Sequence, residues 1–204
     1  MALDQMANQM RTTQIVTTSE QVSVSSAPIW VEHVLGNPEA PVTVLEYGDY
    51  ECPYCAAAAP VLRKLIDSSD GAVRLVFRNF PLFEVHAHAL IAALAAESTA
   101  EAGPEPFWKM HKLLFEKQDR LTDRDLRLYA EHAGGDPDLA VGEAAQRFAD
   151  KVRADYAAGI EAGVEGTPTL YINDSAYSGR IDLGALQRAT GLSGRYAPSI
   201  RHPR

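Results

Sequence analysis

The sequence contains little cysteine: only two of its 204 residues. A framework of disulfides is therefore excluded, and the chain must be stabilised by an apolar core, for which a hydrophobic composition of 46% is sufficient. Basic residues are also scarce, because 19 Lys and Arg accompany 27 Asp and Glu, a formal net charge of -8. Since a nucleic-acid-binding surface needs clustered cations, we predict no nucleic-acid partner and interpret the short basic C-terminus as a solvated tail.

Long apolar runs are missing too. No segment approaches the roughly 20 apolar residues that a membrane helix requires, so we predict no membrane insertion. The first twenty residues also lack the apolar stretch of a signal peptide. We therefore expect a cytoplasmic location, with a periplasmic or other extracytoplasmic location as the alternative if a signal sequence has been removed.

The apolar patterns that are present indicate an α/β fold. Residues 41–47 form an almost continuous apolar run, which is typical of a strand covered on both faces. A helical pattern over residues 56–67 and a second strand at 73–80 follow. A strand-helix-strand crossover of this kind makes the two strands parallel. Strand character returns at 169–172, with a short antiparallel partner, and a last helix covers about 182–190.

Between these strands the pattern is wholly helical, which predicts an insertion. We assign 29–85 and 164–191 to one α/β domain, 86–163 to an inserted all-helical subdomain, 1–28 to an N-terminal arm and 192–204 to a C-terminal tail. Within the insertion, Thr122 is the expected N-cap of one helix. Asp136 is the expected cap of another, with Pro137 at its first position.

The two cysteines form the run Cys52-Pro53-Tyr54-Cys55, directly after the first strand. Cys52 stands where an N-cap would, Pro53 occupies the first helical position, and Cys55 lies one turn further on the same face, so the two sulfurs can meet. Unpaired N–H groups at a helix N-terminus stabilise a thiolate. We expect this effect to outweigh the opposing charges of Asp49 and Glu51, which we take to be exposed carboxylates, and we predict a Cys52 pKa well below about 8.5.

Glu46 is a lone carboxylate in the middle of the otherwise apolar first strand. Burial would raise its pKa toward neutrality, and it could then accept the proton that Cys55 loses during disulfide exchange. The sequence leaves open the alternative that its side chain reaches solvent or pairs with a lysine. Similarly, Pro168 at the entry of the third strand could be an ordinary trans proline without a function.

Together, the segment Asn37 to Val42 and the segment Glu46 to Cys55 resemble the bacterial DsbA-like branch of the thioredoxin superfamily. The resemblance extends over about residues 30–191 and implies a thioredoxin-like fold with an inserted all-helical subdomain. It also implies that Cys52 is the attacking nucleophile, that Cys55 resolves the mixed disulfide, and that Glu46 is the buried acid beneath them.

The same resemblance implies a cis peptide bond between Thr167 and Pro168. The Thr167 backbone would then lie opposite Cys52 and pair with an extended substrate peptide, and Pro53 and Tyr54 would complete the active-site loop. The expected function is that of a dithiol-disulfide oxidoreductase which exchanges its disulfide with protein thiols, needs no cofactor or metal, and depends on an unknown redox partner.

Two other functions stay open. The same cysteines could serve a cytosolic disulfide reductase or a glutathione-linked redox enzyme, since comparable motifs span potentials from about -270 to -120 mV. More remotely, the pair could belong to a zinc-binding or non-catalytic interaction module, with the run His86-Ala87-His88 supplying further ligands. The scattered remaining histidines, at positions 33, 111, 132 and 202, are assigned to surface or interface roles, and Phe107 and Trp108 to core packing.

Overall fold

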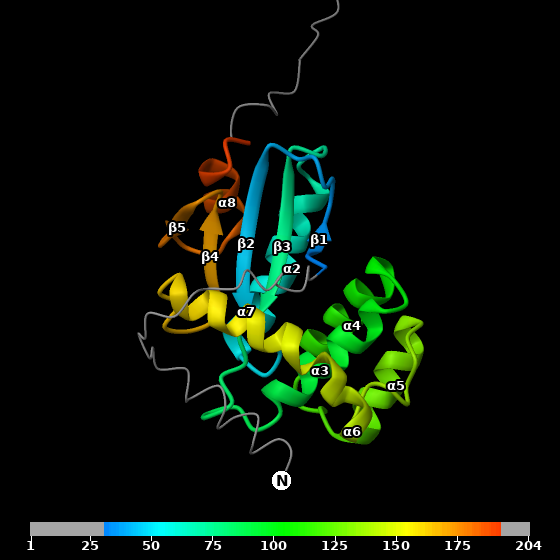
Figure 1. The fold of residues 1–204 in the computed structure, drawn as a ribbon. Coiled ribbons are helices and arrows are strands. Elements are labelled where there is room, and N and C mark those ends of the chain that lie inside the picture. The colour runs from blue at the N-terminus through cyan, green and yellow to red at the C-terminus, as the bar shows by residue number, and fades with distance from the viewer. Residues whose placement is uncertain (1–30, 193–204) are drawn as a thin grey trace, which may run out of the picture.

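A computed structural model describes residues 31–192 of the chain, and its centre is a five-stranded mixed sheet (Figure 1). The strands lie in the order β1-β3-β2-β4-β5. β2 and β3 are parallel and the other neighbours are antiparallel. The strand bounds are β1 His33–Leu35, β2 Val42–Gly48, β3 Val73–Asn79, β4 Thr169–Ile172 and β5 Ser175–Tyr177.

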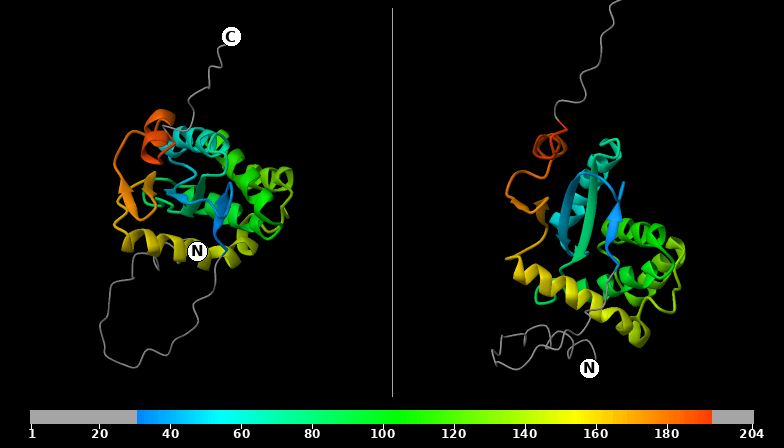
Figure 2. Two further views of the ribbon diagram at one scale, coloured as in Figure 1. Left: turned by 90° about the horizontal axis from the view of Figure 1, so that it is seen from above. Right: turned by 45° about the horizontal axis from the view of Figure 1, so that its top comes forward.

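The parallel pair is joined by helix α2, Pro53–Asp67, which confirms the predicted crossover. α2 lies on one face of the sheet together with α8, Leu183–Ala189, and helix α7, Ala149–Glu161, crosses the opposite face (Figure 2). Both faces of β2 and β3 are therefore covered, which explains their near-continuous apolar sequences. β1 was not predicted, because three residues at a sheet edge carry too little periodicity.

The remaining helices follow β3 and precede β4 in the sequence, and in space they pack beside the sheet (Figure 1). Their bounds are α3 Ala89–Ala100, α4 Pro104–Glu116, α5 Asp123–Ala133 and α6 Gly142–Ala145. α3 is the central one, since ten of its side chains are buried. Phe107 is fully buried and Trp108 packs against the same core, as predicted.

Thr122 caps α5 as predicted, because its side chain accepts a hydrogen bond from the N–H of Asp125. The helix predicted to begin at Asp136 and Pro137 is wrong. The Asp136 carboxylate instead accepts the N–H of Asp138 at 2.8 Å in a turn, and the next helical residue is Gly142. The short side chain of Asp136 satisfies a turn as readily as a helix N-terminus, which is why the sequence misleads here.

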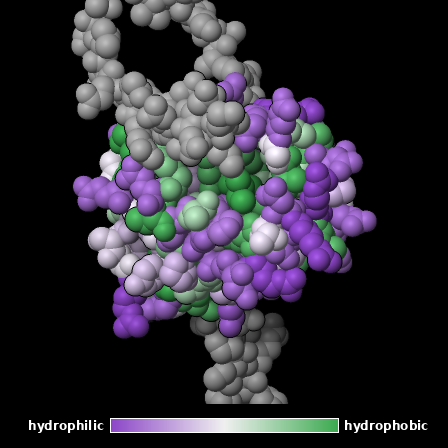
Figure 3. Space-filling view, turned by 90° about the horizontal axis from the view of Figure 1, so that it is seen from below, coloured by the Kyte–Doolittle hydropathy of each residue, from purple (hydrophilic) through white to green (hydrophobic). Residues whose placement is uncertain are grey.

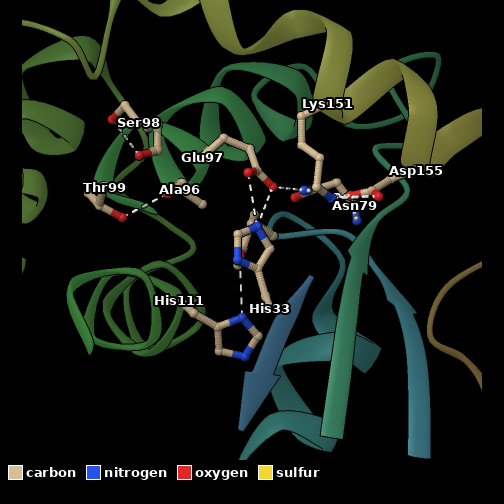
Figure 4. A network of polar contacts seen from close by, with 11 residues as sticks. His33, Asn79, Ala96, Glu97, Ser98, Thr99, His111, Lys151 and Asp155 are labelled. Atoms are coloured by element: carbon tan, nitrogen blue, oxygen red, sulfur yellow. Dashed lines mark hydrogen bonds and ion pairs between the residues drawn. The ribbon is translucent and has the colours of Figure 1, made fainter. Parts of the chain in front are cut away.

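A buried polar network joins the sheet to the helices (Figure 4). His33 Nε2 lies 2.9 Å from both oxygens of Glu97, and Lys151 Nζ lies 2.6 Å from both oxygens of Asp155. Asn79, at the end of β3, donates to both carboxylates. The network connects β1, β3, α3 and α7.

The surface or interface roles predicted for His33 and His111 are wrong, since both side chains are buried inside the chain's own fold. His33 stacks on Phe107 with ring centroids 3.5 Å apart, and His111 Nδ1 lies 3.2 Å from the Tyr50 hydroxyl. Burial, and then the charge of His33, lower the pKa of His111 to about 3, so its ring is neutral. His33 lies in no apolar repeat that would have marked it as buried, whereas His111 shares the buried face of α4 with Phe107 and Leu114, a signal that the sequence-based prediction passed over.

The division into an α/β domain and an inserted subdomain stays a prediction. One apolar cluster contains Cys55 and Phe77 from the sheet side together with Leu94 and Met110 from the helices, so the two parts share a core. The predicted arm, His202 and all of the tail except Leu192 lie outside the described residues. Within residues 31–192, no helix combines the length and the apolar character that crossing a membrane requires.

Candidate active site

The two cysteines lie where β2 leaves the sheet and α2 begins, at the lower end of the molecule in Figure 1. Cys52 is the N-cap with extended backbone angles, φ -76° and ψ 121°, and Pro53 is the first helical residue, as the sequence predicted. No disulfide joins the cysteines in this structure, and both are buried, Cys52 to 3% exposure. Figure 3 views this end, where hydrophobic and hydrophilic residues are interspersed on the surface.

The environment of Cys52 favours its thiolate and lowers its pKa to about 5. The largest contribution is a hydrogen bond from the Cys55 thiol, which together with the Thr167 side chain and the N–H groups of Cys55 and Tyr54 outweighs the cost of burial. The predicted direction is confirmed, but the neighbouring thiol contributes more than the helix N-terminus does. Cys55 is fully buried, and burial above all raises its pKa, so it is the protonated partner.

Glu46 lies near the end of the middle strand β2, opposite Phe77 of β3 and Leu170 of β4. Its side chain is fully buried, and neither carboxylate oxygen finds a hydrogen-bond partner among the described residues. Burial, followed by the negative charge of Cys52, raises its pKa to about 8. The alternative reading of a solvated or lysine-paired side chain is therefore wrong.

The Thr167–Pro168 peptide bond is cis, as the resemblance implied. The Thr167 carbonyl accepts a hydrogen bond from the Cys52 thiol at 3.3 Å, across 115 residues of sequence. The Thr167 hydroxyl is buried and has no partner other than the Cys52 thiolate within the described part of the chain. The structure thus brings Cys52, Cys55, Glu46, Thr167 and Pro168 to one end of the sheet.

Tyr54 behaves differently from its neighbours, because its side chain is 74% exposed. Its backbone N–H supports the Cys52 thiolate, whereas its ring points away from the core. Gln118, which the sequence did not indicate, donates from its side chain to the carbonyl oxygens of Tyr50 and Cys52, each at 2.8 Å. This amide fixes the turn that carries the reactive sulfur.

Asp49 and its contacts were also missed. Asp49 was expected to be an exposed carboxylate, yet it is buried and accepts three hydrogen bonds: from the N–H groups of Glu51 and Leu82 and from His86 Nδ1. The distances are 2.7, 2.8 and 2.8 Å. Its own N–H donates to the Cys55 sulfur at 3.5 Å. The acidic residues just before Cys52 and the histidine pair downstream were the available signal, but nothing local linked them.

The run His86-Ala87-His88 does not contribute metal ligands to the cysteine pair. His86 contacts Asp49, and His88 Nδ1 lies 3.0 Å from Glu51. Across residues 31–192, no group of three or more His, Cys, Asp or Glu side chains is placed to hold a metal ion. The structure uses these histidines to fasten the segment after β3 to the turn before Cys52.

A thioredoxin-like sheet with a Cys-x-x-Cys pair at the start of α2 defines a thiol-disulfide oxidoreductase. The chain belongs to the thioredoxin family, since residues 30–190 match the family model described as Thioredoxin. The DsbA-like resemblance is confirmed by the structure of BdbD from Bacillus subtilis, which matches with a TM-score of 0.69 and 29% sequence identity. The match covers 79% of this chain and 91% of the BdbD chain. A thioredoxin-like oxidoreductase from Silicibacter pomeroyi DSS-3 has a TM-score of 0.66 and 30% identity over 81% and 94% of the two chains.

The curated relatives are longer proteins. Na(+)/H(+) antiporter NhaA 3 of Salinispora tropica is 43% identical over 159 residues, which are 78% of this chain and 24% of that protein. The chain therefore spans about a quarter of the length of the curated relatives it matches.

The predicted cytoplasmic location is wrong. It relied on the missing signal-peptide pattern, whereas the similar structures are those of periplasmic thiol-disulfide oxidoreductases. They include a periplasmic thioredoxin-like protein from Salmonella enterica serovar Typhimurium, with a TM-score of 0.68 and 23% identity over 79% of this chain and 88% of that one. Such a compartment is also where a protein disulfide persists, because it lacks the reducing thiol pool of the cytosol.

Proposed function

We propose that this chain is an extracytoplasmic, DsbA-like oxidase that donates a Cys52–Cys55 disulfide to protein thiols. The observation that carries the proposal is the stabilised Cys52 thiolate, whose pKa is lowered to about 5. Only the dithiol form contains this thiolate, so its stabilisation favours the reduced protein over the disulfide. At pH 7 the lowered pKa stabilises the dithiol form by about 3 kcal/mol, which raises the reduction potential of the pair by about 60 mV.

In the proposed reaction, a substrate thiolate attacks the Cys52 sulfur of the disulfide. The Cys52–Cys55 bond breaks, a substrate–Cys52 bond forms, and Cys55 leaves as a thiolate that takes up a proton. A second substrate thiolate then attacks the substrate sulfur of the mixed disulfide and releases Cys52 as a stable thiolate. The substrate loses two electrons and gains a disulfide, and the disulfide of an oxidising partner protein takes the two electrons up again.

Glu46 supplies and recovers the proton of Cys55. With a pKa of about 8 it is mostly protonated at pH 7 and can donate to the departing Cys55 thiolate. When the pair is reoxidised, Cys55 must lose that proton to attack the mixed disulfide on Cys52, and Glu46 accepts it. Because its carboxylate has no other hydrogen-bond partner among the described residues, nothing competes for this proton.

The substrate polypeptide would lie along the Thr167–Pro168 segment, which already contacts the Cys52 sulfur through the Thr167 carbonyl. An extended peptide can pair with this backbone as an added strand, a mode that recognises main chain more than sequence. Tyr54, exposed beside Cys52, offers an aromatic surface to the residues that flank the substrate cysteine.

The proposal is tested by mixing the oxidised protein with a reduced, unfolded ribonuclease and following the loss of substrate thiols. We expect one substrate disulfide per protein disulfide. A Cys55→Ser variant has no disulfide to donate, so it should not oxidise the ribonuclease; with oxidised glutathione it should accumulate a mixed disulfide on Cys52, because Cys55 is missing and cannot displace the glutathione, and Cys52→Ser should form none. Normal exchange by Cys52→Ser, or a wild-type protein that reduces substrate disulfides but does not oxidise thiols, would contradict the proposed function.

A further inference from the structure

The turn before Cys52 carries a buried negative charge whose effect on the thiolate needs compensation. Asp49 lies three residues before Cys52, is buried, and donates its own N–H to the Cys55 sulfur. A carboxylate so close to a reactive thiolate disfavours it, since like charges in a poorly solvated site repel strongly. The contacts of Asp49 show how the structure offsets that repulsion.

The Asp49 carboxylate accepts hydrogen bonds from three donors, and only one of these donors can carry a full positive charge. The N–H groups of Glu51 and Leu82 are neutral dipoles, whereas His86 is an imidazole whose Nδ1 lies 2.8 Å from Asp49 Oδ2. A carboxylate can only accept, so Nδ1 must hold its proton. The His86 side chain is 21% exposed, which shields it partly from solvent.

The Asp49 carbonyl oxygen accepts the Cys52 backbone N–H at 3.1 Å, so the residue that fixes His86 belongs to the same tight turn as the reactive sulfur. Burial lowers the pKa of His86, but the hydrogen bond and charge of Asp49, followed by the charges of Cys52 and Glu51, outweigh it and raise this pKa above its usual value. Coupling between two sites is reciprocal. A Cys52 thiolate that favours the His86 cation must therefore be favoured by that cation to the same extent.

His88 provides an internal comparison, because it makes the same kind of contact with another carboxylate of the same turn. Its Nδ1 lies 3.0 Å from Glu51, and Glu51 also accepts the His88 backbone N–H. The side chain is 46% exposed. Both histidines thus fasten the same segment to the same turn, but only the His86 contact involves the buried carboxylate.

We propose that His86 is a positioning residue for the thiol-disulfide exchange: fixed on Asp49, it neutralises this buried carboxylate and holds a positive charge that stabilises the Cys52 thiolate. This rests on the proposed function of the cysteine pair. It adds a determinant of oxidising strength that lies outside the Cys-x-x-Cys motif, supplied by the segment after β3.

The test uses three variants of the full chain: His86→Asn, which keeps an N–H donor but loses the charge, His86→Arg, which keeps the charge, and the matched control His88→Asn. The equilibrium constant for reduction of the Cys52–Cys55 disulfide by glutathione should fall about tenfold in His86→Asn, which corresponds to about 30 mV. The thiolate absorbance should titrate at correspondingly higher pH. His86→Arg and His88→Asn should stay within about threefold of the wild type.

Equal constants for His86→Asn and the wild type, or equal losses in the Asn and Arg variants, would overturn the proposal. Failure of the wild type itself to oxidise glutathione would instead refute the proposed function, so the two failures are distinguishable. A second measurement does not depend on folding of a His86 variant. In Cys52→Ser, which removes the thiolate, the NMR titration midpoint of His86 should move to lower pH while that of His88 does not.

The groups that face His86 in this titration are Asp49, Glu51 and Cys52 from the turn between β2 and α2, with Glu84 and His88 flanking it on its own segment. An unchanged His86 midpoint in Cys52→Ser would show that the imidazole and the thiolate are not coupled, and would also overturn the proposal.

Discussion

Replacing Glu46 with Gln should make the protein more stable while it slows disulfide exchange. Glu46 is fully buried, and its pKa is about 8 against an ordinary value of 4.5. Between these two pH values the folded protein holds a proton that the unfolded chain has released. Stability therefore falls as pH rises through this range, and it is highest below pH 4.5.

A glutamine side chain is as polar as a protonated glutamate but does not ionise, so the substitution removes this pH-dependent cost alone. At 1.36 kcal/mol per pKa unit, Glu46→Gln should be more stable than the wild type by less than about 1 kcal/mol at pH 5 and by about 3 kcal/mol at pH 7. The stability difference between Glu46→Gln and the wild type should level off above pH 8.

Urea denaturation of the dithiol forms at pH 5, 6, 7 and 8 measures this difference directly. Glu39→Gln is the matched control, because Glu39 is exposed in the turn before β2 and its replacement should change the free energy of unfolding by less than about 0.5 kcal/mol at every pH. A stability difference for Glu46→Gln that does not grow from pH 5 to pH 7 would refute the argument. In the same variant, reoxidation should slow because Cys55 loses its proton acceptor.

Two substitutions test the packing around the site. Lys151→Met should destabilise the protein by about 3–5 kcal/mol, since it leaves the buried Asp155 carboxylate without its ammonium partner, whereas the exposed Lys112→Met should cost less than about 1 kcal/mol. Gly48→Ala should cost about 1–3 kcal/mol, because an added Cβ would lie 2.4 Å from the ring of the buried Phe77. Urea unfolding at pH 7 measures the free energy of unfolding of the two variants and of the Lys112→Met control. A Lys151→Met variant as stable as Lys112→Met would show that the buried ion pair does not contribute to stability.

Features encoded within a short stretch of sequence were predictable. The Cys-x-x-Cys turn, the crossover from β2 to β3 and the Thr122 cap each depend on residues at fixed local spacing. Burial of Glu46 was indicated by its apolar neighbours, but the absence of any partner for its carboxylate among the described residues became visible only in the structure.

Contacts between distant segments were not predictable where neither a local pattern nor the family resemblance marked the residues. Asp49 and His86 are separated by 37 residues and His33 and Glu97 by 64, and no local periodicity relates their positions. A histidine or aspartate in a loop has the same local sequence character whether it is solvated or paired in the core. For this reason the sequence assigned Asp49 to solvent and His33 to the surface, and both assignments were wrong.

The claim that this chain is an oxidant is tested most directly by its reduction potential. The oxidised protein is equilibrated with a glutathione redox buffer at pH 7, and the fraction of free Cys52 and Cys55 thiols is measured after acid quenching. The stabilised Cys52 thiolate contributes about 60 mV, which predicts a potential above about -210 mV within the range from about -270 to -120 mV spanned by thioredoxin-fold pairs. A potential near about -270 mV, typical of a reductant, would contradict the account.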